Sequence, residues 1–167
     1  MFYKLAATAT LICTTVNVSY AEDVPITGTV QSRCIIQTDT AGVYGNPNAY
    51  TLTTAPADGG VVPVVRFDVS LADAYKGRIT YPTSFSASPA LNDVPTWTGS
   101  IEVDKVGDAA MADYQTDSIT YDQTREYDLT STGSTWFKIN SSAVNGGEKA
   151  FPGGTYRAVA QAECIAK

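Results

Sequence analysis

The sequence contains no histidine, three cysteines and two tryptophans among its 167 residues. Without histidine, the usual Ser-His-Asp and Cys-His arrangements for nucleophilic catalysis cannot be built, and most zinc sites lose a ligand. No glycine-rich loop leads from an expected strand into a helix, so phosphate and dinucleotide cradles are unsupported. No pair of carboxylates stands out for glycosidase chemistry either. We therefore expect a protein that is not an enzyme and has no cofactor.

Basic residues are also few, with 11 Lys and Arg against 17 Asp and Glu and a formal net charge of −6. Such a surface argues against nucleic acid and anionic membranes as partners. Calcium could be bound by acids among Asp104, Asp108, Asp113, Asp117 and Asp122, but their spacing matches no EF-hand loop. We interpret them as turn formers and surface charges, and we predict no metal site.

Residues 1–21 have the composition of a secretory signal peptide. Lys4 supplies a positive start, residues 5–18 an apolar stretch, and residues 19–21 a small-x-small cleavage site. The apolar stretch is too short for a membrane helix, and no later segment is apolar enough to span a bilayer. We expect export of residues 22–167, a length that suits one domain with one core.

Two cysteines remain after export, Cys34 near the beginning of the chain and Cys164 near its end, because Cys13 is removed with the signal peptide. An even pair in a secreted domain usually forms a disulfide. We predict that Cys34 and Cys164 are joined and tie the first strand to the last. Two separate buried thiols are the alternative.

The stretch Glu22–Ile36 opens the mature chain with a period of two. Its apolar parity comprises Val24, Ile26, Gly28 and Val30, and continues with Cys34 and Ile36. Such alternation is typical of a half-buried strand. An unpaired strand at a free chain end invites pairing with another chain, so this strand is paired either within its own domain or with a neighbour.

The rest of the chain has no sustained helical period. In residues 61–70 the apolar parity places Val65, Phe67 and Val69 in the core, and residues 70–75 could form one helical turn. Further strands are expected at 50–54, 77–81, 97–103, 118–121, 124–129, 135–139 and 155–166. About eight short strands separated by Gly, Pro, Asn and Asp favour an all-β sandwich, with a barrel as the alternative.

The last expected strand has a shallow apolar face formed by Tyr156, Ala158, Ala160, Ala162, Cys164 and Ala166. Small side chains let another backbone lie close, or they simply fit beside bulky residues such as Phe67 or Trp97. A sugar-stacking platform around Trp97 or Trp136 is a further possibility. Close approach of another backbone would indicate a protein that assembles through strands. A sugar-stacking platform would indicate a self-contained secreted domain that binds a glycan or other surface ligand.

Both ends of the mature chain resemble subunits of chaperone–usher pili, the fimbrial surface fibres of Gram-negative bacteria. The stretch Glu22–Val30 is similar to the donor strands of colonisation-factor pilins. The Gly-x-Val-x-x-x-Cys pattern of Gly28, Val30 and Cys34 resembles the first core strand of type 1 pilins. At the other end, residues 153–160 resemble the start of a pilin's closing strand, although the next-to-last residue is alanine where pilins commonly have an aromatic.

The resemblance implies an incomplete immunoglobulin-like β-sandwich formed by residues 31–167, with residues 22–30 as donor strand. Val24, Ile26 and Val30 would be its anchors, with Gly28 where the groove is too shallow for a side chain. Implied partners are copies of itself or related subunits, a periplasmic chaperone and an outer-membrane usher. The expected location is a cell-surface fibre, reached through the periplasm, with a structural role.

Overall fold

The computed structural model describes residues 25–108, 118–121 and 123–167. The chain divides into two units, residues 1–30 and residues 31–167. Of the first unit only residues 25–30 are described; they form no strand and are exposed, Ile26 to 96% and Val30 to 79%. The predicted signal peptide and Val24 lie outside the described residues.

The described part of the second unit is all-β. Its strands are β1 (Cys34–Thr40), β2 (Gly45–Asn48), β3 (Thr51–Thr53), β4 (Val64–Val69), β5 (Tyr75–Thr80), β6 (Thr96–Val106), β7 (Ser118–Thr120), β8 (Thr124–Leu129), β9 (Gly133–Val144) and β10 (Gln161–Ala166). Two single 3₁₀ turns, η1 (Pro56–Asp58) and η3 (Gly146–Glu148), lie in connections.

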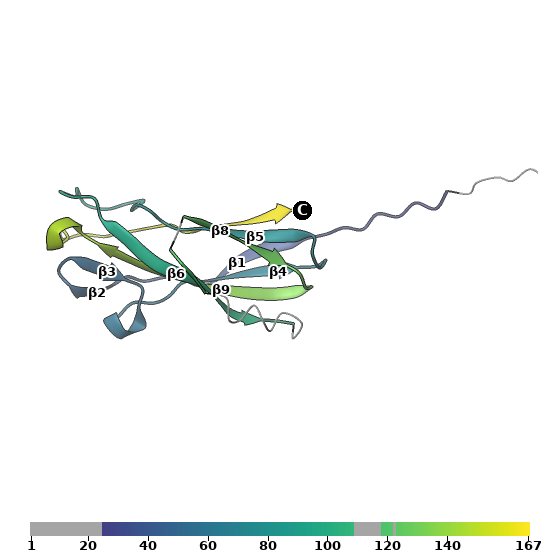
Figure 1. The fold of residues 1–167 in the computed structure, drawn as a ribbon, viewed down its shortest axis with the longest axis horizontal. Coiled ribbons are helices and arrows are strands. Elements are labelled where there is room, and N and C mark those ends of the chain that lie inside the picture. The colour runs from purple at the N-terminus through teal and green to yellow at the C-terminus, as the bar shows by residue number, and fades with distance from the viewer. Residues whose placement is uncertain (1–24, 109–117, 122) are drawn as a thin grey trace, which may run out of the picture. The chain divides into compact units, whose positions relative to one another are not determined.

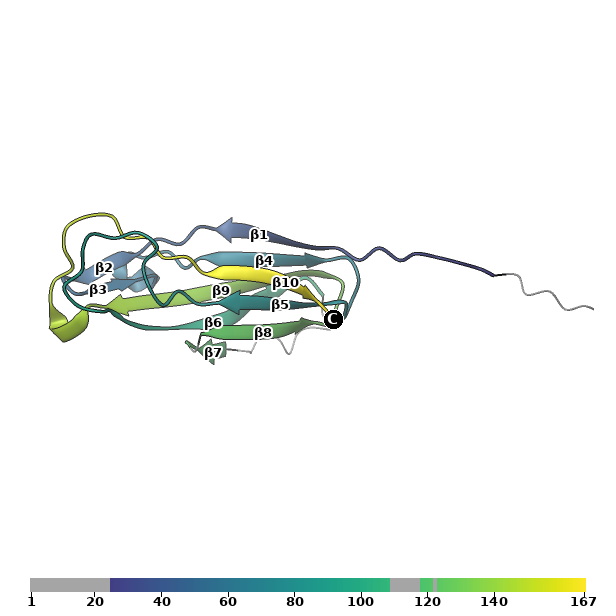
Figure 2. The ribbon, with the colours of Figure 1, turned by 90° about the horizontal axis from the view of Figure 1, so that it is seen from above.

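The strands form two separate antiparallel sheets among the described residues, and no barrel closes (Figures 1 and 2). In the larger sheet β9 is central: β6 lies along one of its edges, and β4 and then β3 along the other. β1 extends this sheet beyond β4, β7 extends it beyond β6, and β2 pairs with β3. The smaller sheet has the order β10-β5-β8.

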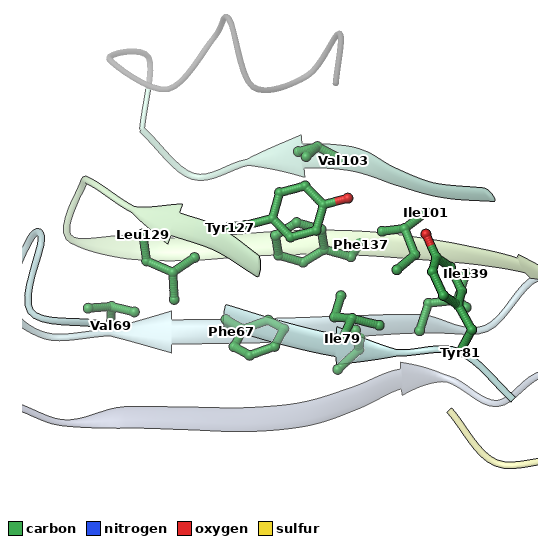
Figure 3. Packing of buried hydrophobic residues seen from close by; sticks show 11 residues of the cluster. Phe67, Val69, Ile79, Tyr81, Ile101, Val103, Tyr127, Leu129, Phe137 and Ile139 are labelled. Carbon is green, nitrogen blue, oxygen red and sulfur yellow. The ribbon is translucent and has the colours of Figure 1, made fainter. Parts of the chain in front are cut away.

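Side chains from both sheets form one core (Figure 3). Phe67 of β4 meets Phe137 of β9 edge to face, with ring centroids 5.5 Å apart, and Tyr127 of β8 lies 4.6 Å from Phe137. The predicted inward parity of β4 is confirmed, since Val65, Phe67 and Val69 are all buried. Each such side chain contributes about 1.5–3 kcal/mol when fully buried.

Several expected strand boundaries are wrong, and for β1 and β9 the observed ends follow from pairing with distant strands. β1 continues to Thr40 along β4, through residues with turn-forming composition. β9 continues to Val144, beyond the expected end of its strand at residue 139, because both of its edges have ladder partners. The opening strand does not run from Val24 to Ile36: residues 25–33 form no strand, and β1 begins at Cys34. Residues 70–75 contain a turn and no helix.

The outer face of the smaller sheet carries ion pairs across its strands. Glu126 of β8 contacts Arg78 of β5 at 2.7 Å and Lys76 at 3.4 Å. The hydrogen bond from Arg78, followed by that from Lys76, holds the pKa of Glu126 below its ordinary value. A lowered carboxyl pKa contributes stability above the unfolded-state pKa, and this contribution is lost as the pH falls through the folded-state pKa.

Glu126→Gln should therefore lower the free energy of unfolding slightly at pH 7. The difference from the parent protein should vanish in acid, once Glu126 is protonated in the folded state. Urea unfolding of both proteins at pH 7 and near pH 2 measures this. Glu163→Gln is the matched control and should change stability less, because Glu163 contacts Arg78 only at 3.5 Å. Equal differences at both pH values would contradict the assignment.

Candidate functional site

Two strand edges without a ladder partner lie next to each other in the part of the chain that the structure describes. β1 pairs only with β4, and β10 pairs only with β5, so the two edges belong to different sheets. β1 and β10 run in opposite directions (Figure 2). Backbone N–H and C=O groups on such edges are available to another strand.

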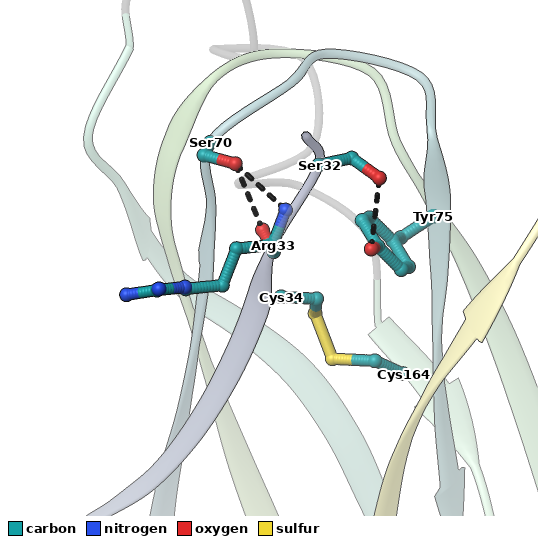
Figure 4. The surroundings of a disulfide bond; sticks show 6 residues. All are labelled: Ser32, Arg33, Cys34, Ser70, Tyr75 and Cys164. Atoms are coloured by element: carbon teal, nitrogen blue, oxygen red, sulfur yellow. Dashed lines mark hydrogen bonds between the residues drawn. A yellow bond between two sulfur atoms is a disulfide. The ribbon is translucent and has the colours of Figure 1, made fainter. Parts of the chain in front are cut away.

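A disulfide between Cys34 of β1 and Cys164 of β10 joins the two sheets at one end of these edges, as the sequence predicts (Figure 4). The Cα atoms of the two cysteines are 6.2 Å apart. Just before β1, the backbone N–H of Arg33 donates to the Ser70 hydroxyl at 2.8 Å, and the Ser70 N–H donates to the Arg33 carbonyl at 3.0 Å. The start of β1 is thus held firmly beside the end of β4.

Beyond the disulfide the two edges enclose a groove of about 480 Å³. The residues around it come from β1, β4 and β9, the loops near Tyr44 and Pro82, and the segment leading into β10. They are Ile36, Thr38, Gly42, Val43, Tyr44, Thr54, Pro63, Val64, Val65, Pro82, Ile139, Ser141, Arg157, Ala158, Val159, Ala160 and Ala162. Neither cysteine is among them, so the groove begins at Ile36 and Ala162.

The predicted small-residue face of the last strand forms one wall of this groove. Ala158, Ala160 and Ala162 are half-buried and alternate with exposed neighbours, as the period of two predicts. The backbone differs from the expected strand over 155–166, because residues 158–160 belong to no ladder and β10 begins only at Gln161. Residues 158–160 therefore alternate between half-buried and exposed side chains although they are hydrogen-bonded into no ladder.

Hydroxyl groups at the floor of the groove are satisfied by one another. The Tyr44 hydroxyl lies 3.1 Å from the Ser141 hydroxyl, and the Ser141 N–H donates to Thr54 Oγ1 at 2.9 Å. Burial raises the pKa of Tyr44, so the phenol stays neutral at physiological pH. Arg157 is the one charged residue among the described residues that line the groove.

A second recess of about 350 Å³ continues the groove past Tyr44. It shares Gly42, Val43, Tyr44, Arg157 and Ala158 with the groove, and adds Leu52, Gly154 and Tyr156. Exposed valines lie at the rim, Val43 at 52% and Val159 at 47% exposure. The whole feature suits an extended, apolar and uncharged chain.

The sequence did not single out Tyr44, Thr54 or Ser141. Tyr44 lies in a turn-rich stretch, and Ser141 lies beyond the expected end of the strand at 135–139. The β3–β9 pairing brings Thr54 beside Ser141, and the bridge between Val43 and Val61 holds the stretch that carries Tyr44. Of the predicted donor-strand anchors, Ile26, Gly28 and Val30 are described and exposed, and no described atom lies within 4 Å of a Cβ placed on Gly28.

Both tryptophans named for a sugar-stacking platform are half-buried and have side chains of the protein near their rings. The Lys105 ammonium lies 4.2 Å from the Trp136 ring centre and the Arg66 guanidinium 5.8 Å from it. Trp97 packs against Phe85, with ring centroids 4.8 Å apart.

The described residues contain no group of three or more metal-ligating side chains. Asp104 pairs with Lys138 at 2.5 Å, and Asp113, Asp117 and Asp122 lie outside the described residues. No helix in the described part of the chain is long and apolar enough to cross a membrane.

Comparisons with protein-family models, with curated proteins and with solved structures found no match to this chain.

Proposed function

We propose that this protein is a structural subunit of an exported surface fibre, in which residues 22–30 of one copy fill the groove of the next. The observation that carries the proposal is the apolar groove between two unpaired strand edges. The same chain also supplies an exposed N-terminal segment with alternating apolar residues. An added strand would continue the ladders of both β1 and β10, which is the chemistry of β-strand addition.

The lengths of segment and groove agree. The donor face runs from Val24 to Val30, seven residues, and the groove wall from Tyr156 to Ala162 has the same number. Seven residues of extended chain span ~23 Å. Small alanine side chains on the wall leave room for larger side chains from the incoming strand.

Burial of the donor face supplies the driving force. Ile26 and Val30 are almost fully exposed in their own chain, and each contributes about 1.5–3 kcal/mol when it is fully buried. The Tyr44 ring lines both the groove and the recess that continues it, and it leaves little depth for a donor side chain there. Gly28, which has no side chain, suits that position. Backbone hydrogen bonds would satisfy the N–H and C=O groups of the two edges.

The direction of the donor strand decides between a fibre and a closed pair. Because Cys34 is the first residue of β1, the segment before it joins the domain at the disulfide end of the groove. A donor strand parallel to β1 brings its own domain to the opposite end, and repetition gives an open head-to-tail polymer. An antiparallel donor strand would bring both domains to the same end and close a dimer.

In this proposal residues 31–167 form an incomplete immunoglobulin-like sandwich that lacks its last strand. A periplasmic chaperone would fill the groove until an outer-membrane usher exchanges it for the next subunit. A host or surface ligand would be a further partner of the finished fibre. The role is structural, with no catalytic residue.

Ala160→Leu should block acceptance of a donor strand and leave donation intact. Ala160 is half-buried on the groove wall, and a leucine there occupies the volume that the donor side chain needs. Gln161→Leu is the matched control, because Gln161 is next to Ala160 on the opposite parity, is exposed and does not line the groove. Sedimentation and electron microscopy should show fibres for the control and none for Ala160→Leu.

Mixing two blocked proteins tests the proposal as a whole. Ile26→Asp protein should accept a strand but not donate one, and Ala160→Leu protein should donate but not accept. Neither should polymerise alone, whereas the mixture should form a one-to-one complex and stop there. Fibres from either variant alone, or no complex in the mixture, would contradict the proposed function.

A further inference from the structure

We propose that the Cys34–Cys164 disulfide is an end stop that fixes the register of the incoming strand, in addition to stabilising the fold. The inference rests on the proposed function, because it concerns the strand that fills the groove. It assigns to the disulfide a role in positioning the partner's residues.

The spacing of the two edges at the disulfide supports this role. Neighbouring strands in a sheet are about 4.8 Å apart, so a strand inserted between β1 and β10 needs them roughly 9.6 Å apart. At Cys34 and Cys164 the Cα atoms are only 6.2 Å apart. No strand can pass between the edges there. The groove accordingly begins at Ile36 and Ala162, which are the next residues on the same faces of the two strands.

The chain around the stop is itself fixed. Arg33 is hydrogen-bonded to Ser70 through both its N–H and its carbonyl, and Ser32 Oγ lies 3.0 Å from the Tyr75 hydroxyl (Figure 4). On the other side, Cys164 is paired with Gly77 inside the β10–β5 ladder. Both half-cystines therefore belong to segments that cannot separate without breaking a sheet.

Such a stop adds to the register preference of the donor segment, in which Gly28 alone distinguishes one inward position from the others. A slip of one residue turns the apolar face outward and is excluded by burial. A slip of two residues keeps Val24, Ile26 and Val30 facing inward and preserves the backbone ladder. The three wall residues Ala158, Ala160 and Ala162 are identical and discriminate poorly between these two positions. A fixed barrier at one end removes the ambiguity.

The test maps where the donor strand lies. The acceptor is the full-length Ile26→Asp protein, whose own segment does not compete for the groove. The probe is a synthetic peptide of residues 22–32 in which a diazirine analogue of leucine replaces Ile26. Photolysis followed by mass spectrometry locates the cross-links in three acceptors: the disulfide-bonded protein, a Cys34→Ala/Cys164→Ala variant, and an Ala162→Leu variant that extends the barrier by one inward position.

In the disulfide-bonded acceptor the cross-links should fall at one position along the groove. In the cysteine variant a second set should appear two residues nearer to the former disulfide, and in Ala162→Leu the set should move two residues away from it, since two residues is the strand period. Unchanged positions in Ala162→Leu, or in a folded cysteine variant, overturn the inference. If the cysteine variant does not fold, Ala162→Leu alone decides. Absence of groove cross-links in all three acceptors instead contradicts the proposed function.

Discussion

Ile26→Asp is expected to abolish fibre formation while the protein stays folded. Ile26 is 96% exposed in its own chain, so the substitution removes no contact that holds the domain together. In a neighbour's groove the aspartate would lose most of its water among largely apolar side chains, because Arg157, the one charged residue of the described lining, is itself exposed to solvent. Loss of the isoleucine and burial of the charge together should weaken strand binding by at least about 4 kcal/mol, which is roughly a thousandfold.

Thr27→Asp provides the matched control for Ile26→Asp. Thr27 is next to Ile26 on the opposite parity, so its side chain should face away from the groove and tolerate a charge. Analytical ultracentrifugation should find polymers for Thr27→Asp and monomers for Ile26→Asp, and the Ile26→Asp monomer should still unfold cooperatively on heating. Equal polymerisation of the two variants would show that the apolar parity of residues 24–30 does not mediate assembly.

Removal of the disulfide should produce the second large effect, a loss of stability. The bridge joins residues separated by 130 positions. In the loop-entropy model, opening a loop of that length in the unfolded chain costs about 5 kcal/mol of folding free energy. The Cys34→Ala/Cys164→Ala variant removes the bridge without leaving an unpaired thiol.

Urea unfolding of the oxidised parent and the double variant measures the loss. To separate it from assembly, both proteins should carry Ile26→Asp so that they are monomeric. A variant as stable as the parent would mean that the packing of β1 against β4 and of β10 against β5 holds the two edges without the bridge. If the bridge does hold the two edges together, the β1 edge should be the first part of the domain to exchange its amide hydrogens in the double variant.

The alternating patterns in the sequence predicted the core well. Val65, Phe67 and Val69 point inward as expected, and Ile101 and Val103 of the expected strand at 97–103 are buried as well. Each of these residues follows the local parity of its own strand, so the pattern alone determines which face is buried. The small-residue face of the last strand was predicted in the same way.

The ladders and the site could be predicted only in part, because they depend on contacts between distant segments. β9 extends through Ser141 since β3, β4 and β6 pair with it, and that pairing is what places Ser141 beneath the groove. Residues 158–160 keep a strand-like alternation but form no ladder, since the β10–β5 ladder ends at the pair Gln161 and Thr80. Sequence periodicity gives the parity of a segment and does not say whether a partner exists.

The most direct test of the fibre proposal is electron microscopy of purified protein spanning residues 22–167, combined with hydrogen exchange of residues 24–30. The proposal predicts long unbranched fibres in which the amides of this segment are protected, and loss of both the fibres and the protection in Ala160→Leu. A stable monomer in which residues 24–30 pair with their own domain, or in which they remain unprotected, would contradict it.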